Sequence, residues 1–166
     1  MITLRPLAMI VLASLMLSAC GFQLRGEARL PASMNQTQLI TPDETSAFVR
    51  ELERLLVANR VDLVDASSDT AAELRIVRER MRRETLTISG DARVREFVLI
   101  FEVTLSVQDA EGRVLIDEET LRLSRDYNFD RQEILAASRE EEFLRADLRQ
   151  AMAARVLRRL EGLGAQ

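Results

Sequence analysis

The 166-residue sequence contains no histidine, no tryptophan and no lysine, and it has a single cysteine. Without histidine the chain lacks the commonest general base of enzymes. Without a second cysteine it can form neither an internal disulfide nor a His/Cys zinc site. A hydrolase that uses carboxylates alone is the enzymatic alternative, but the 27 acidic residues offer no spacing that singles out a pair. We therefore expect a protein that is not an enzyme and holds neither a cofactor nor a metal.

All 23 basic residues are arginine, and together with the 27 acidic residues they give a formal net charge of −4. This balance argues against general nucleic-acid binding, which needs a basic face. Arginine nevertheless supplies forked, bidentate donors that suit phosphates and carboxylates.

The only cysteine, Cys20, closes a short apolar stretch at the N-terminus. Arg5 precedes about a dozen apolar residues, which is typical of a secretory signal peptide and too short for a membrane span of roughly 20 residues. Leu17-Ser18-Ala19-Cys20 resembles the lipobox of bacterial lipoprotein signals, in which the cysteine becomes the first residue and carries an S-diacylglycerol and an N-acyl chain. We expect residues 1–19 to be removed and residues 20–166 to form one domain anchored at Cys20. An ordinary signal peptide with an incidental cysteine is the alternative.

Hydrophobic periodicity organises the next part of the chain. Residues 22–24 and 37–41 are predicted as short strands, and residues 26–35 between them as an exposed linker. Residues 43–60 are predicted as a helix, with Thr41 as N-cap and Pro42 at the first helical position. Residues 61–64 then lead into a polar loop. The predicted buried face of the helix consists of Phe48, Leu52, Leu55, Leu56 and Asn59, the last also being its predicted stop.

Three long segments in the middle have strand character. Residues 73–89 begin and end with alternating apolar residues, although their arginines and glutamates make a helix the competing prediction. Residues 94–108 alternate most clearly, and the turn at residues 109–112 returns the chain into residues 113–129. The predicted inward face of residues 94–108 consists of Phe97, Leu99, Phe101, Val103, Leu105 and Val107.

A final helix is predicted from Asp130 or Ser138 to about Glu161, before two glycines. Acidic residues 140–142 at its predicted start and arginines 155, 158 and 159 at its end would suit the helix dipole. Its apolar positions recur every four residues: Leu144, Leu148, Met152, Val156 and Leu160. The order of elements predicts an α+β fold in which two helices pack on one face of a mostly antiparallel or mixed sheet of about four strands.

Three segments carry a more specific pattern. One is Cys20-Gly21-Phe22-Gln23-Leu24-Arg25-Gly26 followed by Pro31, and another is the leucine-spaced helix ending in Asn59-Arg60-Val61. The third includes Ser124-Arg125-Asp126-Tyr127-Asn128-Phe129-Asp130, Ile134-Leu135-Ala136, Glu140-Glu141 and Leu157-Arg158-Arg159-Leu160. In this order the segments resemble the LptE family of lipopolysaccharide-assembly lipoproteins, and the likeness covers almost the whole chain.

The resemblance implies an outer-membrane lipoprotein without catalytic activity. It implies a one-to-one complex with the large β-barrel LptD, in whose lumen the protein sits as a plug and whose folding it assists. The pair would insert lipopolysaccharide into the outer leaflet. Gly21 after the cysteine resembles the export rule for lipoproteins sent to the outer membrane. A polar, wet barrel lumen suits a chain in which 30% of the residues are charged.

Lipopolysaccharide presents phosphates and carboxylates, which are good partners for arginine. The candidate contacts lie in two basic regions, near residue 90 and before the last helix: Arg93, Arg95, Arg131 and Arg139. Some family members carry basic residues where this chain has Gly90 and Ala137. The alternative is that these arginines, and those of residues 78–83, are exposed charges paired with nearby acids such as Glu79, Glu84 and Glu96, since such pairs contribute only ~0–1 kcal/mol and need no function.

Two other functions stay open from the sequence. A lipid-binding or shuttle lipoprotein would need an apolar cavity of several hundred Å³. An assembly lipoprotein for a different barrel system would share most of the features above.

Overall fold

The computed structural model describes residues 30–65, 71–88, 94–129 and 134–164. The signal segment, Cys20 and the predicted strand at residues 22–24 lie outside these residues, as does the predicted turn at residues 90–91. The elements in chain order are η1 (Ala32–Met34), β1 (Gln36–Ile40), α2 (Ala47–Ala58), β2 (Asp62–Leu63), β3 (Ala72–Ile88), β4 (Val94–Gln108), β5 (Val114–Asn128) and α3 (Ile134–Glu161).

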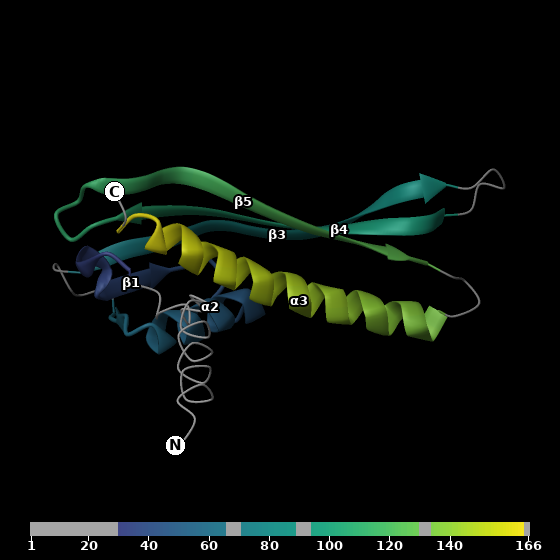
Figure 1. The fold of residues 1–166 in the computed structure, drawn as a ribbon, viewed down its shortest axis with the longest axis horizontal. Helices are drawn as coiled ribbons and strands as arrows, with labels where there is room; N and C mark the ends of the chain where they lie inside the picture. Colours follow the sequence, from purple (N-terminus) through teal and green to yellow (C-terminus); the bar gives the residue numbers. More distant parts are fainter. Residues whose placement is uncertain (1–29, 66–70, 89–93, 130–133, 165–166) are drawn as a thin grey trace, which may run out of the picture.

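The strands form one mixed sheet in the order β2-β1-β3-β4-β5. β1 runs parallel to β2 and β3, whereas β3, β4 and β5 form an antiparallel meander. Both helices lie on the same face of this sheet, and α3 runs along its length (Figure 1). The predicted α+β fold is therefore confirmed. The sheet has five strands rather than about four, because residues 62 and 63, predicted as the approach to a loop, pair with β1.

The core lies between the sheet and the two helices. The predicted inward residues of β4 from Leu99 to Val107 are buried, and Phe101 meets Phe48 of α2 edge to face with ring centroids 5.6 Å apart. From α3, Leu148 and Met152 are fully buried in the same cluster. Burial of each large apolar side chain contributes roughly 1.5–3 kcal/mol. The predicted exposed linker is partly wrong, since Met34 of η1 belongs to this core.

The prediction of a strand rather than a helix for residues 73–89 is confirmed. β3 pairs with β4 along almost its whole length, with an irregularity between Ile76 and Arg78. A helix would have placed its arginines around the element, whereas the strand places alternate residues on opposite faces. The competing prediction failed because helix propensity is a weak term beside pairing with the strongly alternating β4.

The predicted start of the first helix is wrong. α2 begins at Ala47, and Ser46 is its N-cap, with the Ser46 hydroxyl accepting from the backbone N–H of residues 48 and 49 at 3.1 and 3.5 Å. The segment that begins with Thr41 forms a turn instead, in which the Asp43 carboxylate accepts from the backbone N–H of Thr45 at 2.9 Å. The aspartate side chain offers the backbone an alternative to the helix. The predicted stop at Asn59 is confirmed, since this residue is the C-cap.

The final helix starts at Ile134, between the two predicted positions. The Ser138 start is therefore wrong, and Asp130 lies outside the described residues. Residues 140–142 do not belong to the first turn, and the first turn holds no acidic residue. The predicted end is confirmed, with Arg158 and Arg159 in the last turn.

Candidate functional site at the hairpin end

Four elements meet at one end of the domain, which we call the hairpin end. Ile88 at the end of β3 pairs with Val94 at the start of β4, and Glu96 of β4 pairs with Asn128 at the end of β5. α3 also begins at this end, on the right in Figure 1. Arg95 near the start of β4 and Arg139 near the start of α3, one from each basic region predicted from the sequence, therefore belong to elements that meet at this end.

Of the four predicted lipopolysaccharide contacts, the structure describes one side chain. Arg139 is exposed in the second turn of α3, and it makes no hydrogen bond or ion pair with another described residue. Arg95 belongs to β4, but its side chain is outside the description. Arg93 and Arg131 lie outside the described residues.

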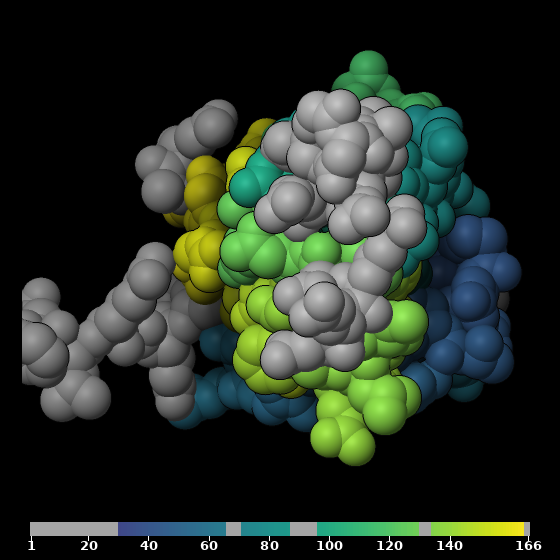
Figure 2. All heavy atoms as spheres, turned by 90° about the vertical axis from the view of Figure 1, so that its right-hand side faces the viewer, coloured from purple at the N-terminus to yellow at the C-terminus, as the bar shows by residue number. Residues whose placement is uncertain are grey.

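Beside Arg139, two large apolar side chains are exposed on α3. Leu135 is 79% exposed and Phe143 is 70% exposed. Since residues four apart lie on the same side of a helix, Leu135, Arg139 and Phe143 form one exposed stripe. Figure 2 faces this end and shows the start of α3 in yellow-green along its lower edge. Ala137 is buried, so it is not part of this stripe.

A second group of side chains, which we call the tip cluster, lies between α3 and the sheet. It consists of Arg83 of β3, Phe97 of β4, Tyr127 of β5, and Glu141 and Arg145 of α3. The Arg83 guanidinium lies 4.5 Å from the centre of the Phe97 ring, a cation–π distance. Phe97 also packs on Tyr127, with ring centroids 5.7 Å apart. Strand alternation explains the arrangement, because Phe97 and Tyr127 are cross-strand partners on the face turned to the helices.

Glu141 is the acceptor at the centre of the tip cluster. It accepts from the Tyr127 hydroxyl at 2.5 Å, from Arg83 Nη1 at 2.8 Å, and from Arg145 Nε and Nη2 at 2.9 and 2.7 Å. Burial disfavours the charged carboxylate, but hydrogen bonds from Tyr127, Arg145 and Arg83 outweigh it and lower the pKa of Glu141 from 4.5 to about 2. The ionised Glu141 therefore ties α3 to β3 and β5.

This geometry divides the arginines of the hairpin end into two groups. Arg83 and Arg145 are engaged by Glu141 and hold the structure together. Arg139 has its donors available for an anion. The arrangement can therefore bind a ligand that combines a phosphate or carboxylate with apolar groups, since exposed apolar side chains lie on both sides of Arg139.

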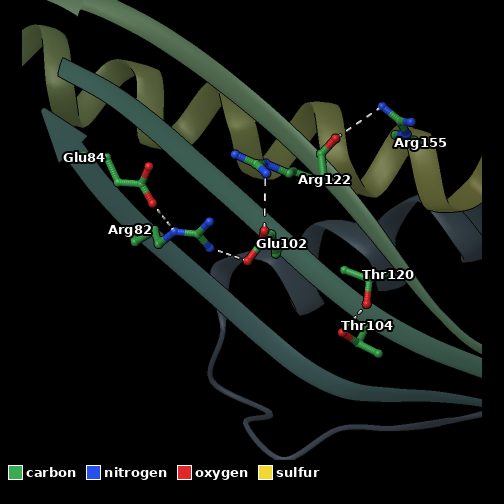
Figure 3. A network of polar contacts seen from close by, with 7 residues as sticks. All are labelled: Arg82, Glu84, Glu102, Thr104, Thr120, Arg122 and Arg155. Carbon is green, nitrogen blue, oxygen red and sulfur yellow. Dashed lines mark hydrogen bonds and ion pairs between the residues drawn. The ribbon is translucent and has the colours of Figure 1, made fainter. Parts of the chain in front are cut away.

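The predicted pairing of the β3 arginines with nearby acids is confirmed in part. Arg82 pairs with Glu84 at 2.7 Å and also with Glu102 of β4, as Figure 3 shows. Glu79 instead accepts from the Ser46 hydroxyl at 2.6 Å. Arg78 and Arg80 form no ion pair with another described residue.

The described residues include no group of three His, Cys, Asp or Glu side chains arranged to hold a metal ion. They include a groove of about 340 Å³ that lies at the end of β1, lined by residues 40–42 and 75–77. The helix–sheet interface itself is filled by the core cluster, which counts against a lipid shuttle that would use an internal apolar cavity. None of the described helices is both long and apolar enough to span a bilayer.

Comparison with known proteins gives one family. The model of the family described as "LptE: Lipopolysaccharide-assembly" matches residues 29–160. The LPS-assembly lipoprotein LptE of Photorhabdus laumondii is 26% identical over 149 residues, which cover 90% of this chain and 81% of the relative. The LPS-assembly lipoprotein LptE of Pectobacterium atrosepticum is 26% identical over 150 residues, covering 90% and 80% of the two chains.

Solved structures agree with the fold. The crystal structure of the rare lipoprotein B from Shewanella oneidensis has a TM-score of 0.69 and 29% identity, and the match covers 76% of this chain and 94% of that one. The solution structure of an uncharacterized lipoprotein B from Nitrosomonas europaea has a TM-score of 0.72 and 26% identity, and the match covers 87% and 93%.

Proposed function

This chain belongs to the LptE lipopolysaccharide-assembly family, and from this membership we propose that it is the lipoprotein partner of an LptD β-barrel in delivering lipopolysaccharide to the outer leaflet. The observation that carries the proposal is the family match over residues 29–160. In this role residues 1–19 are a cleaved signal, Cys20 carries the lipid anchor, and residues 20–166 act at the periplasmic side of the outer membrane and inside the barrel lumen. The role is structural and needs no catalytic residue.

The internal packing supports a plug rather than a free lipid carrier. The space between helices and sheet is occupied by fully buried side chains such as Phe48, Phe101 and Met152. The surface is rich in charge, with β5 and α3 joined by pairs such as Arg125–Asp147 at 3.0 Å and Arg159–Glu119 at 2.9 Å. A solid core under a charged surface suits the polar interior of a barrel.

We place the proposed lipopolysaccharide contact at the hairpin end. Arg139 offers donors for a phosphate or carboxylate, and Leu135 and Phe143 offer apolar contact beside it. Arg95 lies near the start of β4 at the same end, and it is a proposed companion of Arg139. Arg93 and Arg131, which lie outside the described residues, are proposed as further companions.

Co-purification tests the partner role. The full-length chain is co-expressed with a tagged LptD barrel of the same organism, and the complex is isolated from detergent-solubilised envelopes. We expect a one-to-one complex. The measured mass of its small subunit should equal that of a chain beginning at Cys20 plus acyl chains, whereas a Cys20→Ser variant should lack the acyl chains. Recovery of the chain as a monomer without the barrel would overturn the proposal. A complex with a different barrel would identify it as an assembly lipoprotein of another system.

A further inference from the structure

The face of the sheet turned away from the helices carries a row of arginines on β3. Arg78 is paired in register with Thr104, Arg80 with Glu102, and Arg82 with Ile100. Because alternate residues of β4 occupy opposite faces and its odd-numbered residues fill the core, these β4 partners lie on the open face. The three arginines therefore lie side by side along one strand, on the face that α2 and α3 leave uncovered (Figure 1).

Part of the charge on this open face is already matched. Glu102 pairs with Arg82 of β3 and lies 3.8 Å from Arg122 of β5, so two arginines converge on one carboxylate (Figure 3). The hydrogen bond from Arg82 lowers the pKa of Glu102. Glu84 is engaged by Arg82 as well. Further along, Glu73 is engaged by Arg75 at 2.6 Å.

Arg78 and Arg80 take part in none of these ion pairs. Both side chains are exposed, and neither makes a hydrogen bond or an ion pair with another described residue. Arg80 acts on Glu102 only at longer range, as one of the weaker causes of its lowered pKa. On this face, the nearby carboxylates of Glu84 and Glu102 are engaged by Arg82. In a chain of net charge −4, these two adjacent cations have donors available for a partner outside the chain.

The spacing and surroundings of these two arginines define that partner. Residues two apart on a strand lie about 6.6–6.8 Å apart on the same face, which equals the spacing of two carboxylates at alternate positions of another extended strand. Their β4 neighbours, Thr104 and Glu102, are polar. The site therefore suits a charged group rather than the acyl chains of a lipid. We propose that Arg78 and Arg80 form a docking site for an acidic protein surface built from β-strands, with each guanidinium bound to one carboxylate.

This inference rests on the proposed function in one respect: the partner used to test it is the LptD barrel. The docking face is distinct from the hairpin-end stripe of Leu135, Arg139 and Phe143, which lies on α3. A loss of docking therefore need not change binding at the stripe, and the two sites can be separated by mutation.

The experiment compares retention of the full-length lipoprotein on tagged LptD in detergent washes of increasing salt. The Arg78→Gln/Arg80→Gln variant removes two charges, and Arg149→Gln/Arg158→Gln is the matched control. The side chains of these two arginines also make no hydrogen bond or ion pair with another described residue, and they belong to α3, on the other side of the sheet. At about 0.15 M salt we expect the first variant to dissociate roughly 10-fold faster or more, as loss of interface charge pairs does, and the control to behave as the unmodified protein. An Arg78→Lys/Arg80→Lys variant should restore only part of the retention, since lysine keeps the charge but lacks the fork.

The outcomes separate the two proposals. If the unmodified protein does not bind LptD, the proposed function fails. If it binds and the Arg78→Gln/Arg80→Gln variant is retained equally well with an unchanged unfolding temperature, the docking site alone fails. If that variant keeps its retention but loses binding to lipopolysaccharide micelles, the two arginines bind phosphate instead, and the protein docking site is again overturned.

Discussion

Glu141 shows how much a single side chain depends on its surroundings in this protein. From the sequence it is one of three glutamates at the predicted start of a helix, where any of them would suit the dipole. In the structure it is the only one of the three that reaches Arg83 and Tyr127, while Glu140 and Glu142 are exposed. Its side chain is only 18% exposed.

The first prediction concerns the pH dependence of this residue. Its pKa is lower in the folded protein, at about 2, than the ordinary value of 4.5. Its contribution to stability is therefore fully present above pH 4.5 and is lost as the pH falls toward 2, and its upper limit is about 3 kcal/mol. We expect Glu141→Gln to lower the free energy of unfolding by about 2–3 kcal/mol at neutral pH and by less than half of that near pH 3, as measured by urea denaturation.

The adjacent Glu140 provides the control, because it is exposed. Glu140→Gln should leave the free energy of unfolding within about 0.5 kcal/mol at each pH, as surface substitutions usually do. If the difference in free energy of unfolding between the unmodified protein and Glu141→Gln stayed constant from neutral pH to pH 3, the role assigned to the carboxylate would be wrong.

At the scale of single elements, the long strands were predicted more accurately than the starts of the helices. The bounds of β4 coincide with the predicted residues 94–108, since alternation over many residues is a strong signal. The starts of α2 and α3 were not found, because several residues before each helix can act as caps or turns and only the local backbone decides among them.

The second prediction tests the start of α2. Ser46 both caps this helix and donates to Glu79 of β3. We expect Ser46→Ala to lower the free energy of unfolding by about 1–2 kcal/mol, the range for loss of an N-cap. Thr41→Ala, at the position that the sequence favoured, should have a clearly smaller effect because Thr41 lies in the turn before the helix. Equal losses for the two variants, measured by chemical denaturation, would be inconsistent with Ser46 as the cap.

At the scale of the whole molecule, the fold joins segments that are far apart in the sequence. The tip cluster connects β3 to α3 through Arg83 and Glu141, 58 positions apart. The hairpin end likewise brings together the start of β4, which holds Arg95, and the start of α3, which holds Arg139.

The third prediction concerns lipopolysaccharide binding at the hairpin end. We expect Arg93→Ala/Arg139→Ala to weaken binding of purified lipopolysaccharide by roughly 10-fold, since charge-assisted hydrogen bonds contribute ~1.5–3 kcal/mol, without a change in the unfolding temperature. Arg149→Ala/Arg158→Ala is the control with the same change in charge. Unchanged binding by the first variant would show that the proposed lipopolysaccharide contact is wrong. It would not bear on the fold or on the proposed partnership with the barrel.

The sequence by itself determined the types of the long elements, most of the buried residues of β4 and α3, and the family resemblance, because these depend on local periodicity and on motifs read in order. Leu148, Met152 and Phe101 were recognisable as core residues from spacing alone. Only the tertiary structure decided which charges are matched. Arg82 and Arg83 are neighbours in the chain, yet one faces Glu102 on the open face and the other faces Glu141 under α3. The strand turns adjacent residues to opposite faces, and the packing of distant elements then supplies a carboxylate to some arginines. Arg78, Arg80 and Arg139 receive none from the described residues.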